Sequence, residues 1–211
     1  MNTNDWRVLL IGGNSGAGKT YLARALVCQL NIPSLMVDDV RIALQQVTTS
    51  KQHPDLHVFL SYQPEHWKQP DSIVKDWVRV GNAMVKPLRE IIAHHIVVDG
   101  SGLIIIEGDG ILPLLARQHT FSEIPGFESV DIRQKVRAVF LIEDDENEIL
   151  NNLHRRGRGI SSASREVQEA FAHASWLFGQ WLTQEAQTEQ IPILATRPKE
   201  TVIERLLEII L

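Results

Sequence analysis

The sequence predicts an α/β fold, a three-layer sandwich in which helices cover both faces of a parallel sheet. Short apolar runs recur along the chain and are bounded by turn residues. These runs are continuous rather than alternating, which is typical of strands buried on both faces. Helical patterns, with apolar residues three and four positions apart, lie between the runs. The five expected strands are residues 7–11, 34–37, 103–106, 137–142 and 191–194.

Helices are expected at residues 20–30, 72–96, 163–190 and about 200–211. Pro87 lies inside the second of these patterns, which predicts a kink or two abutting helices there. More than 60 residues separate the second and third strands, whereas a crossover needs only about a dozen. We therefore expect a single domain over residues 1–211, with a helical insertion over 42–75 that caps a substrate site.

Composition and charge exclude several classes of protein. The chain has 211 residues and a formal net charge of −5, which disfavours nucleic acid as a partner because duplex binding needs a basic surface. Cys28 is the only cysteine, so neither an intrachain disulfide nor a thiolate zinc site can form, as expected in a reducing cytoplasm. No apolar run approaches the ~20 residues that cross a membrane, and no secretory signal is apparent. We expect a cytoplasmic protein with no membrane partner, as a monomer or a homodimer.

The strongest motif follows the first expected strand and fits the phosphate-loop pattern G-x-x-x-x-G-K-[S/T]. Its residues are Gly13, Asn14, Ser15, Gly16, Ala17, Gly18, Lys19 and Thr20. The glycines let backbone N–H groups approach phosphate oxygens, and the following helix directs its positive end at them. Lys19 is expected to bind the β- and γ-phosphates, and the Thr20 hydroxyl to bind Mg²⁺. A glycine-rich turn with an accidental Lys-Thr is the alternative, but the apolar strand before the loop and the amphipathic helix after it favour a nucleoside triphosphate site.

A guanine-reading N-K-x-D sequence is missing, which favours ATP over GTP. The chain resembles the small-molecule kinases of the phosphate-loop (P-loop NTPase) superfamily, and within them it is most similar to 2-phosphoglycerate-kinase-like and chloramphenicol-phosphotransferase-like proteins. The matching segments are residues 12–20, 37–41, 105–108 and 139–159. The resemblance implies a five-stranded parallel sheet in the order 2-3-1-4-5, ATP and Mg²⁺ as ligands, and an arginine-bearing lid.

Two acidic residues follow the second expected strand, at the edge where such sheets bind ligands. Asp39-Val40-Arg41 is similar to the family's D-x-[I/V/L]-R motif. Asp39 could accept or orient the proton of an acceptor hydroxyl, and a helix N-cap is the alternative role. Asp38 is adjacent, and one of the pair is expected to face solvent or to hold a Mg²⁺-bound water. Arg41 lies where a cation opposes the helix dipole, which indicates either an anionic substrate group or a surface ion pair.

Glu107 and Asp109 follow the third expected strand. The resemblance implies an acid near Mg²⁺ or the substrate at this strand end, and an ordinary acidic turn is the alternative. Tyr62 and Trp67 belong to the insertion and are expected to line a substrate pocket. The candidate metal ligands are Thr20, Asp38 and Glu107. The candidate substrate-binding residues are Asp39, Arg41, Tyr62, Trp67, Glu107 and Asp109.

A dense basic run begins a lid that we expect over residues 154–165. Its arginines, Arg155, Arg156 and Arg158, would clamp phosphate oxygens and stabilise the charge that develops during transfer. A solvated basic loop is the alternative. Arg197 and Pro198 follow the last expected strand, where the resemblance implies that adenine packs.

Together these features predict an ATP-dependent phosphotransferase with Lys19, Asp39 and the lid arginines as catalytic residues. It would move the γ-phosphoryl group to a hydroxyl of a small molecule, which can be anionic. Two alternatives remain open at this point. One is a nucleotide-dependent regulatory or binding ATPase with no small-molecule acceptor, which an exposed apolar face beside the site would favour. The other is a zeta-toxin-like kinase acting on a sugar nucleotide, which a long groove would favour.

Overall fold

A five-stranded, all-parallel sheet forms the centre of the protein in the computed structural model, which describes residues 6–99, 102–117, 134–157 and 159–210. The strands are β1 (Val8–Gly13), β2 (Ser34–Met36), β3 (Ile104–Glu107), β4 (Val136–Ile142) and β5 (Ile193–Ala195). Their order in the sheet is β2-β3-β1-β4-β5, which confirms the predicted topology. Because β1 is central, the loop that follows it opens at the middle of the carboxyl edge of the sheet.

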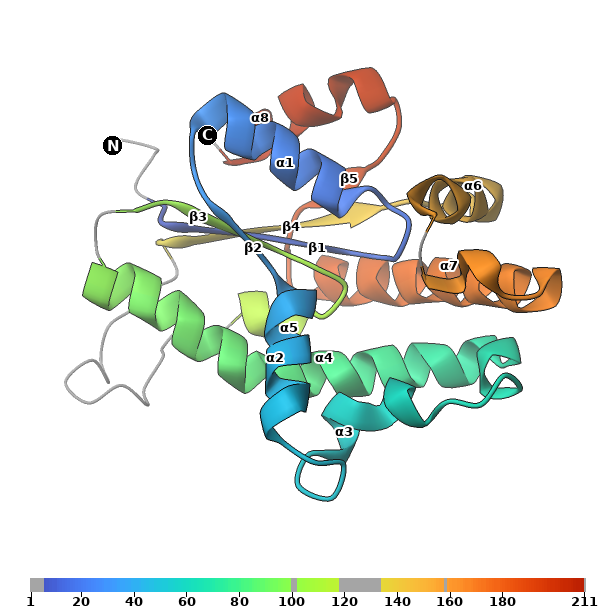
Figure 1. Cartoon of the computed structure of the whole chain (residues 1–211). Coiled ribbons are helices and arrows are strands. Elements are labelled where there is room, and N and C mark those ends of the chain that lie inside the picture. Colours follow the sequence, from blue (N-terminus) through green and yellow to red (C-terminus); the bar gives the residue numbers. More distant parts are fainter. Residues whose placement is uncertain (1–5, 100–101, 118–133, 158, 211) are drawn as a thin grey trace.

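Helices cover both faces of this sheet (Figure 1), which confirms the three-layer sandwich. One face carries α1 (Lys19–Leu30) and α8 (Val202–Ile210). The other carries α4 (Pro70–Ala93), α5 (Pro113–Ala116) and α7 (Arg165–Thr188). The helix α6 (Glu146–Arg156) follows β4 at the carboxyl edge, and α2 (Val37–Val47) and α3 (Pro54–His57) belong to the long connection between β2 and β3. Within the described ranges, no helix combines the length and the apolar character that crossing a membrane requires.

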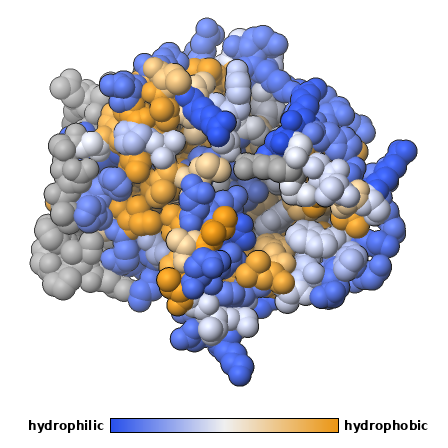
Figure 2. All heavy atoms as spheres, in the orientation of Figure 1, coloured by the Kyte–Doolittle hydropathy of each residue, from blue (hydrophilic) through white to orange (hydrophobic). Residues whose placement is uncertain are grey.

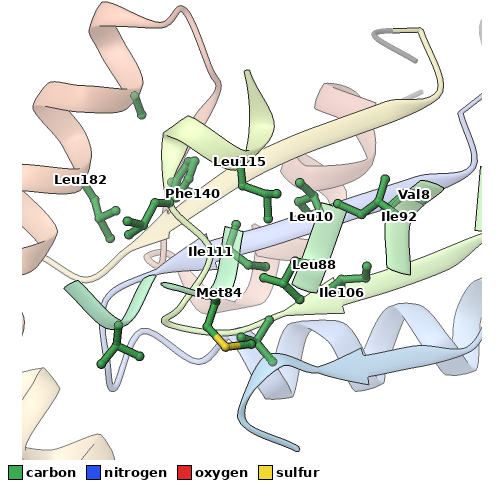
Figure 3. Close-up of a cluster of buried hydrophobic side chains, with 14 of the residues drawn as sticks. Val8, Leu10, Met84, Leu88, Ile92, Ile106, Ile111, Leu115, Phe140 and Leu182 are labelled. Carbon is green, nitrogen blue, oxygen red and sulfur yellow. The ribbon is translucent and has the colours of Figure 1, made fainter. Parts of the chain in front are cut away.

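Two apolar clusters fill the space between the sheet and its helices. Successive strand residues point to opposite faces, so Leu10 packs towards α4 and α7 while Leu9 packs towards α1 and α8. Figure 3 shows part of the first cluster, in which Leu88 of α4 lies near Ile106 of β3 and Met84 lies one helical turn earlier in α4. Both faces of the central strands are therefore buried, which explains why their sequences are continuous apolar runs.

The helix α4 runs through Pro87 without interruption, so the alternative of two abutting helices is not observed. Proline has no N–H to donate to the carbonyl four residues earlier, and its ring crowds that carbonyl, which bends a helix. Figure 1 shows that α4 changes direction partway along its length, where its colour passes from teal to green.

The connection between β2 and β3 is helical, as predicted. Its first helix, α2, begins at Val37 directly after β2, and Val37 is the only residue of α2 that is buried. Figure 2 shows apolar side chains over α2 amid hydrophilic surroundings, and both Ile42 and Val47 of this helix are exposed. A short β2 thus leads straight into a peripheral helix, which places the residues after Val37 in a helical turn rather than in a loop.

The later part of this connection is attached to α7. The ring of Trp67 lies 6.0 Å from that of Phe171, measured between centroids. Lys68 Nζ lies 2.9 Å from Glu166 Oε2, in the first turn of α7. The insertion therefore packs against the helices on the α4 and α7 face of the sheet.

The central position of Leu10 gives a test of this fold. Leu10 is fully buried, so we expect Leu10→Ala to lower the free energy of unfolding by about 2–5 kcal/mol, because the truncation leaves a cavity in the core. Leu60, which is 67% exposed, supplies the matched control, and Leu60→Ala should change stability by less than about 0.5 kcal/mol. Urea unfolding measures both, and equal effects of the two substitutions would contradict the assigned core.

Candidate functional site

The phosphate-loop residues connect β1 to α1 through a tight turn. Gly13 has a φ of 143°, and a Cβ atom there would lie 2.0 Å from the carbonyl oxygen of Leu141 on the neighbouring β4. Only glycine fits, because the two parallel backbones approach closely at this point. Gly18, with a φ of 89°, ends the turn immediately before α1. The first N–H groups of α1 have no partners within the helix and face the loop.

The side chain of Asn14 fastens the loop to its surroundings. Asn14 is fully buried. Its Nδ2 donates to the carbonyl oxygens of Glu143 (2.9 Å) and Ser175 (3.2 Å), and its Oδ1 accepts from the Glu143 N–H (3.1 Å). Gly179 allows α7 to approach, since a Cβ there would lie 3.1 Å from Asn14 Nδ2. The loop is thus fixed to the residue after β4 and to the middle of α7.

Two further side chains hold the loop, and neither was identified from the sequence. Ser175 Oγ donates to the Ser15 carbonyl oxygen (2.7 Å), and Asn152 Nδ2 donates to the Gly16 carbonyl oxygen (2.9 Å). These residues lie more than a hundred positions from the loop. No local pattern marks a polar residue on α6 or α7 as a loop partner, so only the tertiary structure reveals these contacts.

A cavity of about 720 Å³ lies over the loop, within the range of small-molecule sites. Its lining residues are Gly16, Ala17, Gly18, Lys19, Thr20, Tyr21, Leu22, Arg24, Met36, Asp38, Glu107, Gly108, Asp109, Leu141, Asn152, Arg155, Arg156, Thr196, Lys199 and Val202. Acidic residues come from the β2 and β3 side of the sheet, and Arg155, Arg156 and Lys199 come from the α6 and α8 side, while Arg24 comes from α1. The cavity therefore has an acidic end and a basic end, with the phosphate loop between them.

Lys19 lies at the boundary between these two ends. Its side chain is buried, its Nζ donates to the Asn14 carbonyl oxygen (2.8 Å), and it forms an ion pair with Asp109. The predicted site residues Lys19 and Asp109 are thus brought together. A phosphate entering the loop meets an ammonium group that already has a carboxylate partner.

Thr20 and Glu107 form the second polar contact of the loop. Thr20 Oγ1 donates to Glu107 Oε1 at 2.9 Å. Glu107 is 3% exposed, and this burial raises the pKa of its carboxyl group, while the charge of Lys19 and the hydrogen bond from Thr20 act to lower it. Glu107 is therefore a buried acid that is partly compensated by its neighbours.

The oxygen atoms at this point suit Mg²⁺. A hydroxyl and carboxylates are hard ligands, and Mg²⁺ is usually held by one or two carboxylates together with water and substrate phosphates. In the described part of the chain, no group of three or more histidine, cysteine or acidic residues could hold a metal ion by itself. Thr20 and Glu107 fit a magnesium ion that arrives with a nucleotide rather than one held in a closed protein cage.

The two aspartates that follow β2 differ in whether they line the cavity. Both are exposed residues in the first turn of α2. Asp38 lines the cavity, and its Oδ1 lies 3.0 Å from Arg41 Nη2. Neither Asp39 nor Arg41 lines the cavity. The acceptor-facing role expected for Asp39 therefore suits Asp38 better. The signal was present in the sequence, because the four-residue pattern D-x-[I/V/L]-R begins at Asp38 when Arg41 is its last residue.

Tyr62 and Trp67 are not brought to the cavity, and no residue of 42–75 lines it. Their rings lie 4.7 Å apart, both pack on Phe59, and Tyr62 Oη donates to Asp76 Oδ2 (2.7 Å). Burial raises the pKa of the Tyr62 hydroxyl, and the hydrogen bond to Asp76 adds to this effect. These aromatic side chains pack against one another and against α4 and α7, because burying their large apolar area is favourable.

Two of the three arginines of the expected lid lie at the cavity. Arg155 and Arg156, at the end of α6, line the cavity. Arg155 Nη1 donates to Asn152 Oδ1 at 2.9 Å. Arg158 lies outside the described residues.

Arg197 lies among acidic side chains rather than in the cavity. Its Nη2 lies 3.1 Å from an oxygen of Glu143 and 3.0 Å from Asp144 Oδ1. Glu143 is fully buried and also accepts a hydrogen bond from Thr196 Oγ1 (2.6 Å). Neither Arg197 nor Pro198 lines the cavity, although Thr196 and Lys199 on either side of them do. The structure therefore does not bring the two residues expected at adenine into the cavity, because the buried carboxylate draws the arginine to itself.

The raised pKa of Glu107 predicts a pH dependence of stability. The folded protein holds the Glu107 proton at a higher pH than the unfolded chain does, so the stability contributed by this group is fully present below about 4.5 and is lost as the pH rises through the raised pKa. We expect the unfolding free energy of the wild type, relative to Glu107→Gln, to fall as the pH rises over this window. Urea titrations at several pH values measure it, with Glu204→Gln in α8 as a surface control, and a relative stability that rises with pH would contradict the burial effect.

Comparison with known proteins finds a kinase that is similar in sequence over nearly the whole chain. No protein-family model matches it. In sequence it is similar to the 2-phosphoglycerate kinase of Methanocaldococcus jannaschii, with 22% identity over 207 residues that make up 96% of this chain and 62% of that protein. The chain thus spans about three fifths of the length of that relative.

The fold is also similar to that of a solved structure. A gluconokinase from Sinorhizobium meliloti 1021 superposes with a TM-score of 0.50 at 11% identity, over 97% of this chain and 91% of the other. A deoxyadenosine kinase from M. mycoides with bound dATP gives a TM-score of 0.49 at 13% identity, over 96% and 97% of the two chains. The fold shared with the gluconokinase confirms the architecture expected from the resemblance, and the chain is a phosphate-loop protein with a small-molecule-kinase-like fold.

Proposed function

We propose that this protein transfers the γ-phosphoryl group of ATP to a hydroxyl group of a small molecule. The observation that carries the proposal is a single cavity that joins the phosphate loop, with Lys19 and the Thr20–Glu107 pair, to the carboxylate of Asp38. A loop that can hold a triphosphate and an acid that can take a hydroxyl proton are the two parts that phosphoryl transfer requires. The similarity to a 2-phosphoglycerate kinase supports the same reaction class.

The proposed step is an in-line displacement at the γ-phosphorus. The acceptor oxygen forms a bond to phosphorus, the bond from phosphorus to the β–γ bridging oxygen breaks, and ADP leaves with the bonding electron pair. The hydroxyl proton passes to the Asp38 carboxylate. Lys19 and the loop N–H groups stabilise the negative charge on the β- and γ-phosphate oxygens, and they do so without reorganisation because Asn14 fixes the loop.

Thr20 and Glu107 would hold Mg²⁺ beside the phosphates. When bound, the ion supplies positive charge that offsets the β- and γ-phosphate oxygens. Asp109 is the partner of Lys19 and has to share this ammonium group with the incoming nucleotide. Arg155 and Arg156 lie on the opposite side of the loop from these acids and can contact the phosphates from there.

A screen of hydroxylated metabolites tests the function. We expect one class of acceptor to raise ADP release from ATP and Mg²⁺ above the rate measured with water alone. Lys19→Ala should lower this acceptor-dependent rate about 100- to 1,000-fold, because it removes a charge that stabilises the transition state. A rate of ADP release that no acceptor class changes would favour the nucleotide-dependent ATPase without a small-molecule acceptor.

Adjacent aspartates allow a matched test of the proton acceptor. With an acceptor identified, we expect Asp38→Asn to lower turnover about 100-fold or more, because the amide cannot take the hydroxyl proton. Asp39→Asn removes the same charge from the neighbouring position in the same helical turn and should keep turnover within about threefold. Initial rates with both substrates saturating measure the difference. The reverse pattern would assign the role to Asp39.

A further inference from the structure

Tyr21 is an exposed aromatic residue in the wall of the cavity. It follows Thr20 directly, lines the cavity, and is 71% exposed. In the described part of the chain, the side chain of Tyr21 makes no hydrogen bond to another side chain and no ring contact. The other tyrosine of the chain, Tyr62, is hydrogen-bonded to Asp76 and packs on Trp67. A single exposed apolar side chain is ordinary on a protein surface, so the direction in which Tyr21 points decides its role.

The geometry of α1 gives this direction. An α-helix turns by about 100° per residue. Thr20 faces Glu107 at the end of β3, and Leu22 is buried in the core between α1 and the sheet. Tyr21 lies between these two on the helix circumference, on the side of α1 that faces solvent and away from Glu107. Its ring therefore belongs to the part of the cavity that the acidic residues do not occupy.

The two ends of the cavity can then be assigned to the two reactants. The sheet order places β2 and β3 on one side of β1, and β4 and β5 on the other. Asp38 and Glu107 follow β2 and β3, so the acceptor hydroxyl lies on that side. A triphosphate held over Lys19 and Thr20 has its γ end towards Asp38, and the rest of the nucleotide must extend in the opposite direction. That end is lined by Tyr21, Asn152, Arg155, Thr196, Lys199 and Val202.

We propose that Tyr21 is the stacking surface for the base of the bound nucleotide, an inference that rests on the proposed function. An aromatic ring beside the phosphate loop can cover one face of a purine, and Val202 adds apolar surface at the same end of the cavity. This assignment moves the base away from Arg197, which the buried Glu143 holds. Stacking requires only a π-face, so the contact strengthens nucleotide binding without selecting one purine over another.

The test compares two probes that share phosphates and differ in the base. Calorimetric titrations with Mg²⁺ would measure the dissociation constants of ADP and of inorganic tripolyphosphate. We expect Tyr21→Ala to weaken ADP binding about 10-fold or more and to leave tripolyphosphate binding within about twofold of the wild type. Tyr21→Phe keeps the ring and should keep the ADP affinity. Leu60→Ala, which truncates an exposed apolar side chain in the insertion, is the matched control and should bind both probes as the wild type does.

Three results would overturn the proposal. Tyr21→Ala could weaken both probes equally, which would mean that it disturbs the phosphate loop. It could weaken neither, which would place the base elsewhere. Tyr21→Phe could lose as much ADP affinity as Tyr21→Ala, which would mean that the hydroxyl matters and not the ring. A wild-type protein that binds neither probe would instead overturn the proposed function, and this outcome is distinct because it appears before any variant is made.

Discussion

The buried side chain of Asn14 is the contact on which the rest of the site depends. A phosphate loop works only if its backbone N–H groups are held in place before the ligand arrives, because ordering them on binding would use up binding energy. Asn14 uses its amide group for three hydrogen bonds to the backbone of Glu143 and Ser175. The backbone carbonyl oxygen of Asn14 accepts a hydrogen bond from Lys19 Nζ. One residue therefore fixes the loop to β4 and α7 and also directs the loop lysine.

Charge is arranged locally rather than over the whole surface. The chain carries a net charge of −5, yet the cavity brings Lys19 together with Arg155, Arg156 and Lys199. The acids on the other side are tied to neighbours: Asp109 to Lys19, and Glu107 to Thr20. The proposed nucleotide would therefore meet positive charge inside the cavity despite the negative charge of the whole chain, and the acids beside the loop would be left for the proposed metal ion and proton transfer.

Much of the fold could be predicted because its signals are local. Continuous apolar runs mark strands buried on both faces, and the glycine, lysine and threonine of the loop follow β1 as expected. The carboxyl edge of the sheet brings Lys19, Thr20, Glu107 and Asp109 to one cavity, as their positions after the strands predicted. The choice between Asp38 and Asp39 depends on where α2 begins, since adjacent helical residues point about 100° apart.

Other features of the site depend on contacts between distant residues. The aromatic residues of the insertion pack on α4 and α7 because those helices offer them apolar partners, such as Phe171 and Trp77. Arg197 is held by Glu143, whose burial no sequence pattern reveals. Asn152 and Ser175 are ordinary polar residues on helices until the loop is placed beside them. Local patterns thus indicate which chemistry is present, whereas tertiary packing decides which residues reach it.

The helix α7 links the movement of the insertion to that of the phosphate loop, because it contacts both. Its first turns hold the insertion through Glu166 and Phe171, and one turn later Ser175 donates to the carbonyl oxygen of Ser15 in the loop. A packed helix moves as a stiff rod, so the insertion cannot be displaced along α7 without straining a loop hydrogen bond. The 24 residues of α7 connect the insertion to the phosphate loop, two regions that lie far apart in the sequence. A displacement of the insertion would therefore be transmitted to the backbone of that loop.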